Sequence, residues 1–284
     1  MLSHDPLWPR AGDWPSPSRA SGPSRASGSG RADVALAGIP THLTSLSPTS
    51  AHLTPAAVRE ALRRYSLSTA LDIVDAGDAV DPDSVDATAF IAGIDAALLI
   101  ALGGDNSATV PVATGRSARG LVTVDAHHDL RDGISNGSPV RQLIAAGLDG
   151  RRVVQVGIEP FANSRAYAER AADLGITVIT RDELRRRPIA DVMAEAVELA
   201  GDHVHVDLDI DVCDRSVAPA CPASVPGGIS AIELRDAARS AGAHPSVTSV
   251  DLVEVDASAD TADQRTIRLT ALCVLEIIKG YGER

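Results

Sequence analysis

Ionisable side chains alternate with apolar ones in two short segments of the chain. Residues 125–129 read DAHHD and residues 207–211 read DLDID. Alternation places such side chains on one side of an extended chain. Carboxylates crowded in this way repel one another unless a cation neutralises them or some of them carry a proton. A ligand set of carboxylates with one or two imidazoles is more typical of a Mn²⁺ site than of a closed structural Zn²⁺ site. Two ions that share a carboxylate can supply a hydroxide nucleophile near neutral pH.

The elements that must position these segments are eight short apolar runs, rich in Val, Ile and Leu. They cover residues 33–40, 71–78, 96–104, 120–127, 152–158, 176–180, 203–211 and 247–255. Helical patterns lie between most of them, including one for which Thr54 is the expected N-cap and Pro55 the first helical residue. Repeated strand–helix units predict an α/β fold with a parallel sheet and helices on both of its faces.

Polar residues gather where four of the predicted strands end. They lie in the segments 103–106, 125–132, 207–214 and 254–256. Ligands of open parallel sheets bind beyond the carboxyl ends of the strands. We therefore expect these four segments to form one site at one edge of the sheet.

Composition divides the chain of 284 residues into two parts. Residues 15–30 are nearly all Ser, Pro, Gly, Ala and Arg, and this composition predicts a flexible arm over residues 1–32. Residues 33–284 are expected to form a single catalytic domain. Trp8 and Trp14 precede the Pro/Ser/Gly-rich stretch; they are equally compatible with docking on the body or a neighbouring subunit and with an unstructured end.

Charge and cysteine content restrict the partners. The formal net charge is -12, which argues against nucleic acid. No apolar stretch is long enough for a membrane helix, and no signal-peptide pattern is present. The three cysteines have no paired spacing, so we expect no disulfide framework, and a cytoplasmic protein that acts on a small molecule.

Four motifs in order carry a resemblance to a known family. They are GGDNS (103–107), DAHHD (125–129), DIDVCDRSVAPACPASVPGG (209–228) and DLVEVD (251–256). Together they resemble the ureohydrolases, namely arginases, agmatinases and formimidoylglutamases, over residues 33–280. The resemblance implies a three-layer α/β/α sandwich around a mostly parallel eight-stranded sheet. It also implies two Mn²⁺ ions per subunit and a homo-oligomer, a trimer or a hexamer.

The resemblance also assigns roles to residues. Asp125 and Asp209 match carboxylates that bridge two Mn²⁺ ions. Asp129 matches a ligand that is also suspected of handling protons. Glu254 matches the carboxylate that hydrogen-bonds the planar cationic head of the substrate. The full set that matches metal ligands is Asn106, Asp125, His127, Asp129, Asp209 and Asp211.

Two departures from the family pattern select a subfamily. Asn106 stands where the family usually has a histidine ligand, so the ion on that side is expected to bind weakly or not at all. Asn136 stands where arginases and agmatinases carry a catalytic histidine. Formimidoylglutamases also lack that histidine. They resemble this chain in the Asp-Leu-Arg segment after the metal histidine, here residues 129–131. They also resemble it in the stretch that follows, here residues 136–139.

The expected activity is therefore hydrolysis of a linear amidine, N-formimidoyl-L-glutamate, to L-glutamate and formamide in histidine breakdown. Arg131 and Arg141 are the expected partners of the substrate carboxylates because the arginine fork matches a carboxylate. Asn136 and Ser138 are further expected substrate contacts. Two alternatives stay open: an agmatinase or other guanidino-acid hydrolase that releases urea, and a degenerate arginase-like protein that binds without catalysis.

Overall fold

The computed structural model describes residues 5, 7–16 and 30–284. Eight strands form one sheet in the order β2-β1-β3-β8-β7-β4-β5-β6, and every neighbouring pair is parallel. The strands are β1 (Ala32–Ile39), β2 (Ile73–Asp78), β3 (Ala96–Gly103), β4 (Gly120–Val124), β5 (Val153–Ile158), β6 (Thr177–Thr180), β7 (Val204–Asp209) and β8 (Val247–Val253). The predicted α/β fold with an eight-stranded sheet is confirmed.

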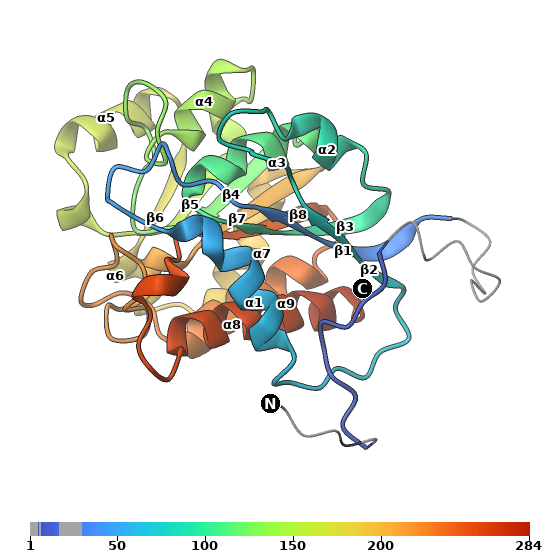
Figure 1. Cartoon of the computed structure of the whole chain (residues 1–284). Helices are drawn as coiled ribbons and strands as arrows, with labels where there is room; N and C mark the ends of the chain where they lie inside the picture. The colour runs from blue at the N-terminus through green and yellow to red at the C-terminus, as the bar shows by residue number, and fades with distance from the viewer. Residues whose placement is uncertain (1–4, 6, 17–29) are drawn as a thin grey trace.

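Helices cover both faces of the sheet, which makes three layers (Figure 1). One face carries α2 (Thr88–Ala92), α3 (Thr109–Gly115), α4 (Pro139–Ala145) and α5 (Arg165–Asp173). The other carries α1 (Thr54–Leu62), α6 (Arg181–Leu184), α7 (Ile189–Ala200), α8 (Ala231–Ala243) and α9 (Arg265–Tyr281). Because both faces are covered, β4, β5 and β7 are buried along their whole length, including the polar residues Gln155, His205 and Asp207.

The start of α1 differs from the prediction. A short 3₁₀ turn, Ala51–Leu53, precedes the helix, and Thr54 is its first residue instead of its N-cap. The Thr54 hydroxyl donates to the backbone oxygen of Val255 at 2.5 Å, so it ties the helix to the loop after β8. On this helix Val58 and Leu62 face the core and are completely buried.

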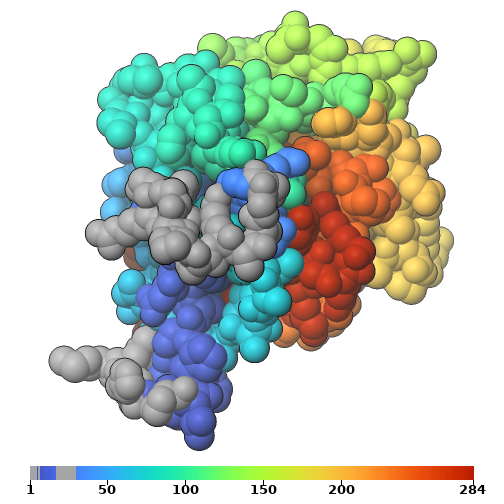
Figure 2. Space-filling view, turned by 90° about the vertical axis from the view of Figure 1, so that its right-hand side faces the viewer, coloured from blue at the N-terminus to red at the C-terminus, as the bar shows by residue number. Residues whose placement is uncertain are grey.

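Part of the predicted N-terminal arm lies against the body. The backbone N–H of Ala11 donates to Tyr65, and Pro15 accepts from the backbone N–H of Asp75. Ala11 is buried, and Trp14 packs against the core cluster on the α1 side of the sheet. Figure 2 shows this segment in dark blue beside the lighter blue and cyan residues of α1 and the loop that follows. Residues 17–29, the rest of the Pro/Ser/Gly-rich stretch, lie outside the described residues.

Two further expectations concern the cysteines and the membrane. Cys213, Cys221 and Cys273 are all buried and free, as the lack of paired spacing predicted. Within the described part of the chain, no helix is both long and apolar enough to cross a bilayer.

Candidate metal centre

The four polar segments meet at the carboxyl ends of the four central strands. β3, β8, β7 and β4 are neighbours in the sheet. β4 ends at Val124, immediately before Asp125, and β7 ends at Asp209. Asn106 follows β3 and Glu254 follows β8. The four segments, which are far apart in the sequence, therefore meet at one edge of the sheet, as the strand pattern predicted.

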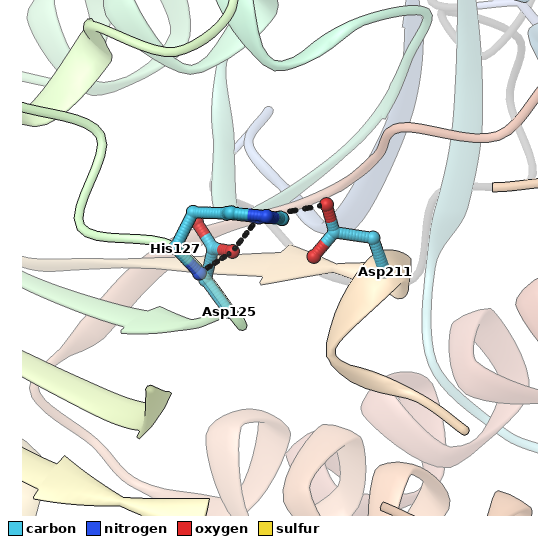
Figure 3. A group of neighbouring side chains, drawn as sticks. All are labelled: Asp125, His127 and Asp211. Carbon is cyan, nitrogen blue, oxygen red and sulfur yellow. Dashed lines mark hydrogen bonds and ion pairs between the residues drawn. The ribbon is translucent and has the colours of Figure 1, made fainter. Parts of the chain in front are cut away.

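One half of the site is a triad of Asp125, His127 and Asp211, whose ligand atoms lie within 4.8 Å of one another. The imidazole lies between the two carboxylates (Figure 3), with His127 Nδ1 3.0 Å from Asp211 Oδ2 and 3.4 Å from Asp125 Oδ1. The backbone N–H of His127 also donates to Asp125 Oδ1 at 2.6 Å. Asp125 Oδ2 and Asp211 Oδ1 are buried and have no hydrogen-bond partner among the described residues.

The other half joins Asn106 to Asp129 and Asp209. Asn106 Nδ2 donates to Asp129 Oδ2 at 2.6 Å and to Asp209 Oδ2 at 3.2 Å. Asp105, and not Asn106, caps the short turn here by accepting from the backbone N–H of Ser107. The loop packs tightly because Gly104 has no Cβ: one would lie 1.9 Å from the backbone oxygen of Thr41.

The two residues expected to act in catalysis both have left-handed backbones. The φ angle is 52° at Asp129 and 63° at Glu254. Such conformations are uncommon for residues with a Cβ and cost of order 1–3 kcal/mol, so the surrounding structure must enforce them. At Glu254 the enforcement is visible, because its backbone N–H donates to Gly104 at 2.9 Å.

The Glu254 carboxylate is held from two sides. Its Oε1 accepts from the backbone N–H of Asn106 and from Asn136 Nδ2, each at 2.7 Å. Asn136 Oδ1 in turn accepts from the backbone N–H of Leu46 at 3.0 Å. Asn136 therefore fastens the loop that contains Leu46 to the carboxylate.

A cavity of about 420 Å³ opens above these groups. Its lining contains the predicted residues His127, Asp129, Arg131, Asn136, Asp209, Asp211 and Glu254. Asp125 and Asn106, each 1% exposed, lie beneath it. Sequence reasoning missed the rest of the wall, notably Leu46, Tyr167 and Pro222. Leu46 and Pro222 lie in separate loops and Tyr167 lies on α5, and none of the three belongs to a local motif that would reveal it.

Two predicted substrate contacts do not line the cavity. Ser138 is completely buried, where its Oγ donates to the backbone oxygen of Ser135 and accepts from the backbone N–H of that residue. Arg141 donates to the backbone oxygens of Arg131 and Gly133, and so it fastens the loop after the metal strand.

Charge is balanced within the Asp125–His127–Asp211 half. The Asp211 carboxylate is the main cause that raises the pKa of His127 to about 12. Burial opposes ionisation of Asp211, but the charge of His127 outweighs it and lowers the pKa of this carboxyl. Burial and the charge of Asp211 raise the pKa of Asp125 to about 6.

The remaining carboxylates lack such compensation. Burial, with the charge of Asp125, raises the pKa of Asp129 well above its usual range, and burial with the charge of Asp211 does the same for Asp209. Burial raises the pKa of Glu254 to about 8, against the hydrogen bond from Asn136. Buried acids with raised pKa values and unpartnered oxygens suit a site for divalent cations, because cations would restore the charged forms.

A second polar layer lies below the ligands, inside the sheet. Asp207 pairs in register with Asp251, and both are completely buried. His205 Nε2 lies 3.2 Å from Asp251 Oδ2, and His205 Nδ1 lies 2.9 Å from Ser249 Oγ. The Thr109 hydroxyl contacts the same Asp251 oxygen at 2.8 Å. The sequence places Asp207 in the DLDID segment and Asp251 in the DLVEVD motif, but their spacing gives no sign of the contacts with His205 and Thr109.

Comparison with known proteins agrees with this geometry. Residues 32–279 match the sequence pattern of the arginase family. The chain belongs to the arginase family.

Within that family, formimidoylglutamases are among the most similar relatives. The chain is 32% identical to the formimidoylglutamase of Bacillus subtilis, over 87% of this chain and 86% of the relative. It is 34% identical to that of Halalkalibacterium halodurans, over 86% of each. The crystal structure of the Bacillus subtilis formimidoylglutamase superposes with a TM-score of 0.85 at 27% identity, over 99% of this chain and 94% of the other. Proclavaminate amidino hydrolase from Streptomyces clavuligerus shares the fold, with a TM-score of 0.79.

Proposed function

We propose that this arginase-family chain hydrolyses N-formimidoyl-L-glutamate to L-glutamate and formamide. Water supplies the oxygen of formamide, and the amidine carbon–nitrogen bond to glutamate breaks. The observation that carries the proposal is the cavity itself, where carboxylates for a planar amidinium face the same space as Arg131. Of the described lining residues Arg131 is the only Lys or Arg. The similarity to named formimidoylglutamases supports the same substrate.

The proposed cofactor is a pair of Mn²⁺ ions. Asp125, Asp209, His127, Asp211, Asn106 and Asp129 would hold the ions, with His127 and Asp211 on one side of the site and Asn106 and Asp129 on the other. The oxygen-rich ligand set with one imidazole suits Mn²⁺. When bound, such a pair lowers the pKa of water and polarises the amidine.

The chain's own groups would then orient the substrate and hold its protons. Glu254 would accept hydrogen bonds from the amidinium N–H groups, because Asn136 and the backbone N–H of Asn106 fix its Oε1. Asp129 would take the proton that water loses, since its carboxylate lines the cavity beside the other candidate ligands. The Asn136 amide does not ionise, so it cannot transfer a proton to the leaving group. In this proposal it positions Glu254.

Arg131 would bind a carboxylate of the glutamate part. Its side chain is exposed at the cavity and lies over Gly137, where an added Cβ would be 2.7 Å from Arg131 Cδ. Its guanidinium makes no hydrogen bond or ion pair with another residue of the described chain. The fork is therefore available to a carboxylate in two-point contact.

Product analysis tests the proposal most simply. Protein reconstituted with Mn²⁺ is given formimidoylglutamate, agmatine, arginine and guanidinobutyrate, and release of glutamate, formamide and urea is measured. We expect formimidoylglutamate to have the highest kcat/KM. Urea from any guanidine at a higher kcat/KM would replace the substrate, and no turnover with bound Mn²⁺ would favour the non-catalytic binding protein.

Replacing Arg131 by Ala tests the carboxylate contact. We expect KM for formimidoylglutamate to rise by about 10- to 100-fold, the equivalent of roughly 1–3 kcal/mol of lost charged hydrogen bonding, with a smaller change in kcat. Arg151→Ala, at an arginine that bonds the exposed Asp149, is the matched control. Equal KM values for the two variants would remove Arg131 from substrate recognition.

Two properties remain predictions by resemblance. The assembly is expected to be a homotrimer or homohexamer, which sedimentation would test. A cytoplasmic setting is consistent with three free buried cysteines.

A further inference from the structure

Thr109 lies where the metal centre meets the polar layer beneath it. It is the first residue of α3 and is completely buried. Its Oγ1 lies 2.6 Å from Asn106 Oδ1 and 2.8 Å from Asp251 Oδ2. One hydroxyl group thus connects a candidate metal ligand to a buried carboxylate on β8.

Proton counting limits what this bridge can do. A threonine hydroxyl carries one proton and accepts through its lone pairs, so it donates to only one of the two oxygens. With Oδ1 of Asn106 facing Thr109, the hydroxyl stands between two acceptors. If the Asn106 amide is turned over, its Nδ2 donates to Thr109, and Thr109 donates to Asp251. The Thr109 hydroxyl then has one donor and one acceptor as partners, instead of two acceptors.

The turned amide also changes what faces the site. In the structure, Asn106 Nδ2 points at Asp129 and Asp209. Turning the amide presents Oδ1 to the same two carboxylates, which is the donor atom a divalent cation requires. The far end of the chain is anchored, because Asp251 contacts His205 Nε2 at 3.2 Å and His205 contacts Ser249.

We infer that Thr109 is a positioning residue: it accepts from the Asn106 amide and donates to Asp251, and so aims the Asn106 oxygen at a cation shared with Asp129 and Asp209. This inference rests on the two-ion centre of the proposed function. It assigns Thr109 no contact with substrate. The hydroxyl instead determines which end of the Asn106 amide, the oxygen or the nitrogen, faces the ion.

The test is Mn²⁺ binding, measured by calorimetry and by counting bound ions with electron paramagnetic resonance. Thr109→Val keeps the shape of the side chain and removes the hydroxyl. We expect it to weaken binding of one of the two ions by about 10- to 100-fold, as loss of partners behind metal ligands typically does. Thr109→Ser should restore binding. Thr270→Val is the matched control, because this buried hydroxyl donates only within α9, to Thr266 at 3.0 Å.

The outcomes separate this inference from the function. If wild type binds two ions and Thr109→Val binds both with unchanged affinity, the relay is wrong and the metal centre stands. If wild type binds no Mn²⁺, both are overturned. Should valine prevent folding, Thr109→Ala compared with Thr109→Ser carries the same test, and equal affinities would again contradict the relay.

Discussion

The two halves of the metal centre differ in how protein groups alone balance charge. On one side, the His127 imidazole lies 3.0 Å from Asp211 and forms an ion pair with it. On the other, Asn106 offers Asp129 and Asp209 only a neutral amide. Accordingly, the pKa of Asp211 is lowered whereas those of Asp129 and Asp209 are raised.

The difference teaches what each half requires of a cation. In the His127 half an ion must displace a strongly held proton from the imidazole, and it gains a good nitrogen ligand. In the Asn106 half a cation displaces protons only from the buried carboxyl groups of Asp129 and Asp209. The further ligand that it gains there is an amide oxygen, which is a weaker donor than imidazole. We therefore expect two unequal ions, with the tighter one beside His127.

The largest expected effect is that of breaking the His127 half. Asp211→Asn removes both a ligand and the charge that pairs with the imidazole. We expect loss of one bound ion and a fall in kcat/KM of about 10³-fold, since metal activation supplies several kcal/mol. Metal analysis and kinetics measure this, with the exposed Asp173→Asn on α5 as control. Full activity in Asp211→Asn would exclude this half from the reaction.

An intermediate effect is expected from converting the Asn106 half. Asn106→His combined with Thr109→Ala supplies an imidazole and the room that the larger ring needs. We expect the weaker ion to bind about tenfold more tightly, because imidazole is the better donor. Calorimetry with Mn²⁺ measures it. Unchanged affinity would mean that the amide does not limit binding on this side.

The smallest expected effect is on stability as a function of pH. In EDTA-treated protein, His127 and Glu254 keep protons that the unfolded chain loses, because their folded pKa values are raised to about 12 and about 8. The folded state then binds more protons, so the free energy of unfolding falls as pH rises from 6.5 to 8. We expect Tm to drop by at least about 2–4 °C over this range.

Saturating Mn²⁺ should reverse this trend, because ligands bind metal in their deprotonated forms. Glu254→Gln is the control, since it removes one of these titrations and should flatten the slope in EDTA. A Tm that rises with pH in the EDTA-treated protein would contradict the assigned protonation states.

The sheet was predictable from the sequence because buried parallel strands follow from regular spacing, whereas the ligand set, Asn106 included, was predicted from the resemblance to ureohydrolases. Buried parallel strands give continuous apolar runs, and the strand ends fix where residues such as Asp125 and Asp209 must meet. The deviation at Thr54 shows the limit of this reasoning. Its hydroxyl bonds Val255, more than two hundred residues away, and a helix-cap pattern contains no information about that partner.

The cavity wall and the layer beneath the ligands were not predictable for the same reason. Leu46 is tied to the site by Asn136, and Thr109 joins Asn106 to Asp251 on β8; Asn136 and Asp251 are distant in sequence from the residues they contact. Arg141 shows a different limit of sequence reasoning. Proximity in sequence to the metal strand suggested a substrate contact, but its guanidinium bonds backbone oxygens of residues 131 and 133.

The most direct measurement is anomalous diffraction at the manganese edge from crystals equilibrated with increasing Mn²⁺. The account predicts a first peak among Asp125, His127 and Asp211, then a second between Asn106, Asp129 and Asp209, with Asn106 Oδ1 facing it. A first peak on the Asn106 side, or no second peak at saturating Mn²⁺, would contradict it.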